Sequence, residues 1–110
     1  MEKLVKGDIV VIDFPYSDLT SSKKRPSLVV ADLNGDDLIL CQITSKKREE
    51  NDIILLKKEE TAAGNIDFDS FIRASRLFTA NKLIIHYKLD HIKTSKIKEV
   101  ESKLCEIFTR

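Results

Sequence analysis

Tryptophan is absent from this chain of 110 residues, cysteine occurs only twice, and no long run of apolar residues is present. A helix that crosses a membrane needs about 18 consecutive apolar residues, and no segment comes near this length. The N-terminal residues MEKLVKGD also lack the apolar core of a signal peptide. These absences argue against a membrane protein, and we expect a cytoplasmic one.

The two cysteines, Cys41 and Cys105, lie far apart, one in a predicted strand and the other in a predicted helix. In a reducing compartment such residues act as small apolar side chains. We therefore predict that both are buried and that they form no disulfide. Since no Cys or His spacing resembles a metal site, we expect neither a metal ion nor another cofactor.

The chain also has no large excess of charge of either sign, because 19 Lys and Arg residues balance 18 Asp and Glu residues to a net charge of +1. A nearly neutral protein cannot hold nucleic acid by bulk attraction, so a polyanion partner would have to bind at a local basic patch. Without tryptophan, stacking on bases would depend on few aromatic residues, and Tyr16 is the one that we expect to be exposed. The length fits a single domain over residues 1–110.

Short β-branched and alternating apolar segments predict a mainly β protein. Polar segments rich in turn formers separate them, among them residues 15–24 and 45–51. The fifth predicted strand is long and has room to bend. The expected strands are residues 7–14, 25–33, 36–44, 52–57, 70–79 and 84–89.

From about Ser95 the apolar period changes to three and four residues, which is typical of an amphipathic helix. Thr94 or Ser95 can cap its N-terminus, and charged residues such as Lys96 lie between the apolar positions. Several short strands with one terminal helix predict a small, strongly curved barrel. The residues of the predicted apolar stripe are Ile97, Val100, Leu104, Ile107 and Phe108.

The Asn34-Gly35 dipeptide between two apolar runs predicts a β-hairpin with a two-residue type I′ turn. In such a hairpin the numbers of paired residues sum to 69, so Arg25 faces Thr44 and Ser27 faces Gln42. Directly opposed side chains lie on the same face of the two strands. The open end of the hairpin is therefore predicted to gather hydrogen-bonding side chains around one arginine.

Arginine and threonine suit a phosphodiester, because a guanidinium can grip a phosphate with two parallel hydrogen bonds and a hydroxyl can donate a third. The segment TSSKKR ends at Arg25 and the segment TSKKR begins at Thr44, so both concentrate positive charge at the open end of the hairpin. A solvated strand end with lysine-rich loops is the alternative explanation. The flanking basic residues are Lys23, Lys24, Lys46, Lys47 and Arg48.

The segments GDIVVIDFPYSDLTSSKKRPSLVV, CQITSK and SFIRASRLFTANKL resemble the MazF/PemK toxin family over nearly the whole chain. This resemblance implies an SH3-like barrel with a C-terminal helix, the MazF/CcdB-like toxin fold. It also implies a toxin of a type II toxin–antitoxin system that cleaves single-stranded RNA at specific sequences without a metal ion. The implied partners are a cognate antitoxin and a second copy of the chain, for which the apolar run Ile9–Ile12 is a candidate interface.

The family's catalytic arginine and threonine carry over onto Arg25 and Thr44. The implied reaction is attack of the RNA 2′-hydroxyl on the adjacent phosphate, with Arg25 stabilising the developing negative charge. No general base is evident, and we interpret His86 and His91 as structural and Arg73 and Arg76 as solvated. The residues expected to bind the substrate are Lys24, Ser27, Gln42, Ser45, Lys46 and Tyr16.

Two other functions fit the same fold, since fold alone does not decide activity. One is a toxin that does not cleave RNA or that acts on DNA gyrase, and the other is an RNA-binding barrel without cleavage. The pairing of Arg25 with Thr44 favours the nuclease, because a protein-binding surface has no need of a phosphate clamp there.

Overall fold

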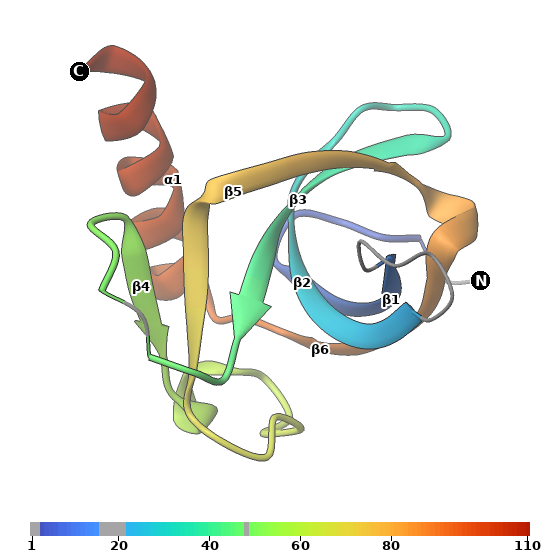
Figure 1. Ribbon diagram of the computed structural model, residues 1–110, viewed down its shortest axis with the longest axis horizontal. Helices are drawn as coiled ribbons and strands as arrows, with labels where there is room; N and C mark the ends of the chain where they lie inside the picture. The colour runs from blue at the N-terminus through green and yellow to red at the C-terminus, as the bar shows by residue number, and fades with distance from the viewer. Residues whose placement is uncertain (1–2, 16–21, 48) are drawn as a thin grey trace.

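Antiparallel pairing joins the strands into one six-stranded sheet in the order β4-β5-β3-β2-β1-β6. The computed structural model describes residues 3–15, 22–47 and 49–110, and the sheet and the helix α1 lie within them (Figure 1). Two short 3₁₀ turns, Lys58–Glu60 and Lys82–Ile84, precede β5 and β6. The elements are β1 (Asp8–Pro15), β2 (Ser22–Asp32), β3 (Asp37–Thr44), β4 (Ile53–Leu56), β5 (Ser70–Asn81), β6 (Ile85–His91) and α1 (Thr94–Thr109).

The sheet curls until its two edge strands meet, as the predicted barrel requires. Thr61, which follows β4, forms an isolated β-bridge with Ile92, which follows β6. The Ala62 N–H donates to the His91 carbonyl oxygen at 2.7 Å beside this bridge. Between Arg73 and Leu77, β5 departs from its register with β3 and turns a corner (Figure 1). The predictions of a curved barrel and of a bent fifth strand are confirmed.

Apolar side chains fill two separate core clusters. One lies between the sheet and α1 and contains Leu28, Cys41 and Ile43, while the other contains Val29 and Leu40. The β2–β3 hairpin is therefore apolar on both of its faces. The run Ile9–Ile12 is buried within this chain, so the prediction that it supplies a dimer interface is wrong.

The turn of the β2–β3 hairpin differs from the two-residue turn that Asn34-Gly35 predicts. The Leu33 N–H donates to the Asp37 carbonyl oxygen at 3.3 Å, so three residues form the loop. Asn34 has a φ of 61°, which is the left-handed conformation that Asn tolerates. A bulge at Val30 then shifts the register back, so that Val29 pairs with Leu40.

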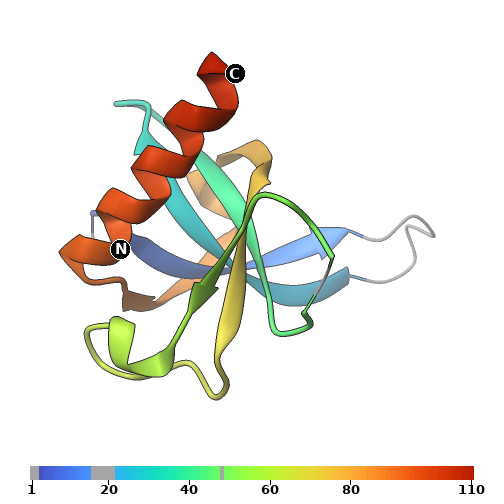
Figure 2. The same ribbon diagram turned by 90° about the vertical axis from the view of Figure 1, so that its left-hand side faces the viewer.

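Helix α1 lies across the outside of the barrel (Figure 2). Ile97, Val100, Leu104 and Ile107 pack on the core as predicted, whereas Phe108 is 70% exposed and was wrongly assigned to the stripe. The capping residue is Lys93, which makes no side-chain cap bond, so the Thr94 or Ser95 cap is also wrong. Among the helices of the described residues, none combines the length and the apolar character of a membrane-crossing helix.

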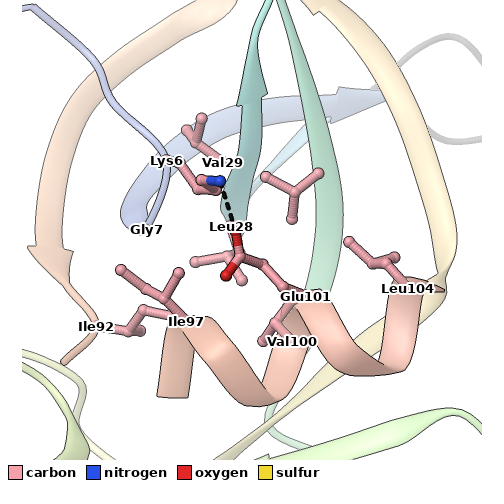
Figure 3. A pocket seen from close by; sticks show the side chains of 10 residues that line it. Lys6, Gly7, Leu28, Val29, Ile92, Ile97, Val100, Glu101 and Leu104 are labelled. Carbon is pink, nitrogen blue, oxygen red and sulfur yellow. Dashed lines mark hydrogen bonds and ion pairs between the residues drawn. The ribbon is translucent and has the colours of Figure 1, made fainter. Parts of the chain in front are cut away.

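The N-terminal segment, β6 and α1 meet at Gly7 and Asp8. Gly7 has a φ of +99°, and a Cβ there would lie 2.7 Å from Ile97 Cδ1, so only glycine fits beside the helix (Figure 3). Asp8 is fully buried, where its Oδ1 lies 2.7 Å from His91 Nδ1. Gly7 therefore lets Ile97 of α1 pack close to the start of β1, and Asp8 links β1 to β6 through His91.

Two smaller expectations are also corrected. β2 begins at Ser22, so residues 22–24 extend a strand that was predicted to start at Arg25. Cys105 is exposed although Cys41 is buried, and both are free thiols. Burial raises the pKa of the Cys41 thiol to about 12, which keeps it protonated at neutral pH.

Candidate active site

A cavity of about 350 Å³ opens at the end of the β2–β3 hairpin away from its turn. Lys24 and Arg25 come to it from β2, and Thr44 and Ser45 come from the end of β3. The segment from Asn65 to Ser70 and the β6 residues Tyr87 and Leu89 complete the lining. The cavity therefore lies where the predicted arginine and threonine converge.

Strand register brings these two side chains together. Ser27 pairs with Gln42, and two residues further along the antiparallel strands Arg25 and Thr44 reach the open end. On its other side Arg25 pairs with Ile12 of β1, whose β-branched run holds the strand in the middle of the sheet. Pro26 favours an extended backbone at Arg25.

Thr44 is 6% exposed, so its side chain is fixed by packing. Its Oγ1 accepts the Lys46 N–H at 3.2 Å. This bond turns the chain after β3 and leaves the hydroxyl proton available to donate to a bound group. Lys46 itself is exposed next to the cavity.

Asp90 anchors the segment that forms the far wall. Its carboxylate accepts the Ala63 N–H at 2.9 Å and the Asn65 N–H at 2.8 Å. Burial alone would raise the pKa of Asp90, but the backbone donors Asn65, His91 and Ala63 outweigh it, and the pKa lies below its usual value. A charged Asp90 therefore holds this wall in place.

Several lining residues were missed by the sequence prediction. Asn65, Asp67, Phe68 and Ser70 lie in a polar segment that carries no periodic signal. Asp67 is the carboxylate among the described lining residues. Tyr87 could have been found, because it stands two residues from Leu89 and so points to the same face of β6.

The structure brings together only part of the predicted substrate-binding set. Lys24 and Ser45 line the cavity with Arg25 and Thr44. Ser27 is fully buried, and its hydroxyl has no partner among the described residues. Gln42 lines a second cavity instead, so the expectation that Ser27 and Gln42 join the site is wrong. Tyr16 lies outside the described residues.

The side chain of Gln42 contacts Arg73 on β5. The Arg73 guanidinium donates to the Gln42 side-chain oxygen and to both carboxylate oxygens of Glu50, the shorter of these at 2.5 Å. Arg73 is 7% exposed, so the interpretation that it is solvated is wrong, whereas Arg76 is exposed as expected.

Neither predicted structural histidine lines the cavity. His86 Nε2 lies 2.9 Å from Asp13 Oδ2 near the surface, and His91 contacts the buried Asp8. Within the part of the chain that the structure describes, no three His, Cys, Asp or Glu side chains gather in a way that could hold a metal ion.

The sequence model of PemK-like, MazF-like toxins of type II toxin–antitoxin systems matches residues 5–108. The chain belongs to this family. The match spans the strands, the cavity and almost all of α1, and it confirms the resemblance of the Gly-Asp, Arg-Pro and Ile-Thr-Ser segments. No curated protein matches this toxin by sequence.

Solved structures confirm the toxin fold. A MazE-MazF crystal structure from Deinococcus radiodurans is similar with a TM-score of 0.79 and 16% identity, covering 98% of this chain and 97% of that one. An endoribonuclease in complex with its cognate antitoxin from a mycobacterial species gives 0.75 and 12%, covering 96% and 95%. The Mycobacterium tuberculosis toxin MazF-mt6 gives 0.72 and 12%, covering 92% and 95%.

Proposed function

We propose that this MazF-like toxin is an endoribonuclease that cleaves single-stranded RNA in the Arg25–Thr44 cavity. The observation that carries the proposal is that Arg25, Thr44 and Lys24 line one open cavity. A guanidinium, a hydroxyl and an ammonium group are the donors that a phosphodiester needs. One of the similar solved structures is named as an endoribonuclease.

In this mechanism the 2′-hydroxyl oxygen of the RNA attacks the adjacent phosphorus and loses its proton, while the bond from phosphorus to the 5′-oxygen breaks and that oxygen takes up a proton. The products are a 2′,3′-cyclic phosphate and a free 5′-hydroxyl. Arg25 stabilises the negative charge that develops on the phosphoryl oxygens. The Thr44 hydroxyl donates a hydrogen bond to the same phosphate and orients it. The chemistry draws only on groups of the protein and the RNA, so we expect cleavage to persist in excess EDTA.

The exposed lysines beside the cavity would hold neighbouring phosphates of the strand. Lys24, Lys46 and Lys47 are exposed at this end of the hairpin. The same positive rim would attract an acidic tail of a cognate antitoxin, and one similar solved structure is an endoribonuclease in complex with its cognate antitoxin. We further propose that the toxin works as a homodimer, which sedimentation at micromolar concentration tests.

The direct test is cleavage of a mixed-sequence single-stranded RNA by Arg25→Ala in excess EDTA. We expect at least a 1,000-fold lower rate, because removing one electrostatic stabiliser of the transition state has effects of about this size. Arg76→Ala is the matched control, since Arg76 is an exposed arginine that does not line the cavity. Unchanged cutting by Arg25→Ala would disprove the mechanism, and binding without cutting by the wild type would favour the non-cleaving barrel.

A further inference from the structure

Two large aromatic side chains stand in solvent at the same cavity. Phe68 is 70% exposed and Tyr87 is 52% exposed, and both line the cavity with Arg25. Phe68 comes from the segment before β5 and Tyr87 from β6. Their exposure forgoes the burial free energy that an aromatic ring gains in a core, which points to a ligand that covers them.

The backbone around Phe68 is fixed, so its ring is presented at a defined place. The Ser70 hydroxyl donates to the Phe68 carbonyl oxygen at 3.1 Å. Asp69 Oδ1 accepts the Lys58 N–H at 3.2 Å, and Asn65 donates its backbone N–H to Asp90. Hydrogen bonds therefore hold the segment on both sides of the ring.

The neighbouring groups indicate what covers the two rings. A basic groove that carries exposed aromatic rings is the arrangement that binds single-stranded nucleic acid, because phosphates meet the cations and bases stack on the rings. Here Lys24 and Arg25 supply the cations within the same cavity. One nucleotide supplies a phosphate and a base joined covalently, so a strand held at Arg25 brings a base to the same cavity.

We propose that Phe68 and Tyr87 form a stacking platform for a nucleobase of the RNA strand whose phosphate lies at Arg25. The proposal rests on the proposed function for its ligand, and it assigns base binding to two residues outside the catalytic pair. Stacking tolerates every base, so these rings contribute affinity and hold the strand in line for attack.

The test is binding of a fluorescein-labelled, fully 2′-O-methylated RNA oligonucleotide, which lacks the attacking hydroxyl and cannot be cleaved. Phe68→Ala and Tyr87→Ala should each weaken binding about 5- to 150-fold, the range measured for loss of one stacked base. Phe68→Tyr, which keeps a ring, should bind nearly as the wild type does. Phe108→Ala is the matched control, because Phe108 is also 70% exposed but lies on α1.

A set of the same oligonucleotides, each with one abasic position, identifies the stacked base. Loss of that base should weaken binding to the wild type more than binding to Phe68→Ala, because the Phe68 part of the contact is already absent there. If Phe68→Ala and Tyr87→Ala bind as Phe108→Ala does, the platform is disproved. It is also disproved if Phe68→Ala changes the sedimentation coefficient, since the ring would then be an interface between copies.

These outcomes separate the platform from the proposed cleavage. A wild type that binds the methylated RNA but cuts no RNA, with the aromatic variants still weakened, would disprove the nuclease and keep the platform. A loss of binding in Arg25→Ala with normal binding in both aromatic variants would keep the phosphate clamp and disprove the platform.

Discussion

The two ends of the β2–β3 hairpin follow different rules. At the turn end the loop has three residues, and the paired residues Asp32 and Leu38 have numbers that sum to 70. Toward the open end Ser27 pairs with Gln42, and the sum is the 69 that a two-residue turn predicts. The bulge at Val30 separates the two registers.

The difference shows that two local irregularities cancel. The extra loop residue shifts β2 by one position relative to β3, and the extra residue of the bulge shifts it back. Because strand side chains alternate between faces, a one-residue slip would turn a whole strand over. The bulge at Val30 is therefore what allows Arg25 and Thr44 to reach one cavity despite the longer turn.

Inserting one alanine between Leu28 and Val29 should break this compensation and have the largest effect. The insertion would take the place opposite Cys41, so that Leu28 would lie opposite Gln42 and turn to the wrong face. Each buried leucine or isoleucine lost to solvent removes about 1.5–3 kcal/mol, so we expect a loss of several kcal/mol in the free energy of unfolding. Urea denaturation followed by circular dichroism measures it.

A compensating deletion provides the control. Removing Val30 from the variant with the insertion restores the number of residues between Leu28 and Ala31, so Leu28 can again pair with Cys41. The double variant should therefore regain most of the stability and the RNA cleavage that the insertion loses. Equal damage in both variants would show that the number of residues there does not set the register.

The same hairpin shows which features of the site could be predicted from the sequence. Its register near the site was predictable, because the apolar alternation of residues 25–33 and 36–44 fixes which faces enter the core. The burial of Ser27 was not predictable, because the pairing of the two hairpin strands says nothing about a third strand beside them. β1 pairs Val10 with Ser27, and Ser27 is fully buried beside it.

The far wall of the cavity could not be predicted from the sequence for a related reason. The segment from Asn65 to Ser70 has no period, and Asp90, distant in sequence, sets its position through backbone hydrogen bonds. Gln42 likewise depends on Arg73, with which it pairs across β3 and β5. Local patterns predicted the strands, the barrel and one wall of the site, and long-range polar contacts built the other wall.

At the open end, Thr44→Val should remove function with little loss of stability. Valine has nearly the same shape, so the buried position stays filled, but the hydroxyl that donates to the phosphate is lost. We expect kcat for RNA cleavage to fall about 100- to 1,000-fold. Loss of the acceptor for the Lys46 N–H should lower the free energy of unfolding by about 1 kcal/mol. Thr44→Ser should keep most of the activity, and a fully active Thr44→Val would refute the role of the hydroxyl.

Acid should loosen the open end before the turn end. The pKa of Asp90 is lowered in the folded state, so its stabilisation is complete above the ordinary carboxyl pKa of about 3.9. It is lost as the pH falls through the lower folded value. The protection factors of the Ala63 and Asn65 amides against hydrogen exchange should therefore fall below pH 4, while that of the Leu33 amide should change less.

Asp90→Asn tests the same contact at neutral pH. It should lower the free energy of unfolding by about 2 kcal/mol, because a carboxylate that accepts several hydrogen bonds is replaced by a neutral amide. The difference between wild type and variant should stay constant from pH 6 to 8 and shrink below pH 4. A difference that grows in acid would contradict this assignment.

The smallest expected effects distinguish the observed turn from the one that the dipeptide predicts. A type I′ turn needs a positive φ at both central residues, so Gly35→Ala would then lower the free energy of unfolding by about 1 kcal/mol. In the structure the positive φ is at Asn34 and not at Gly35, and a Cβ on Gly35 would meet nothing within 4 Å.

We therefore expect Gly35→Ala to change the free energy of unfolding by less than about 0.5 kcal/mol and Asn34→Ala to lower it by about 1 kcal/mol, as measured by urea denaturation. Neither should alter RNA cleavage, because the bulge at Val30 lies between this loop and the cavity. The reverse order of the two stability losses would restore the two-residue turn and leave the bulge without its compensating role.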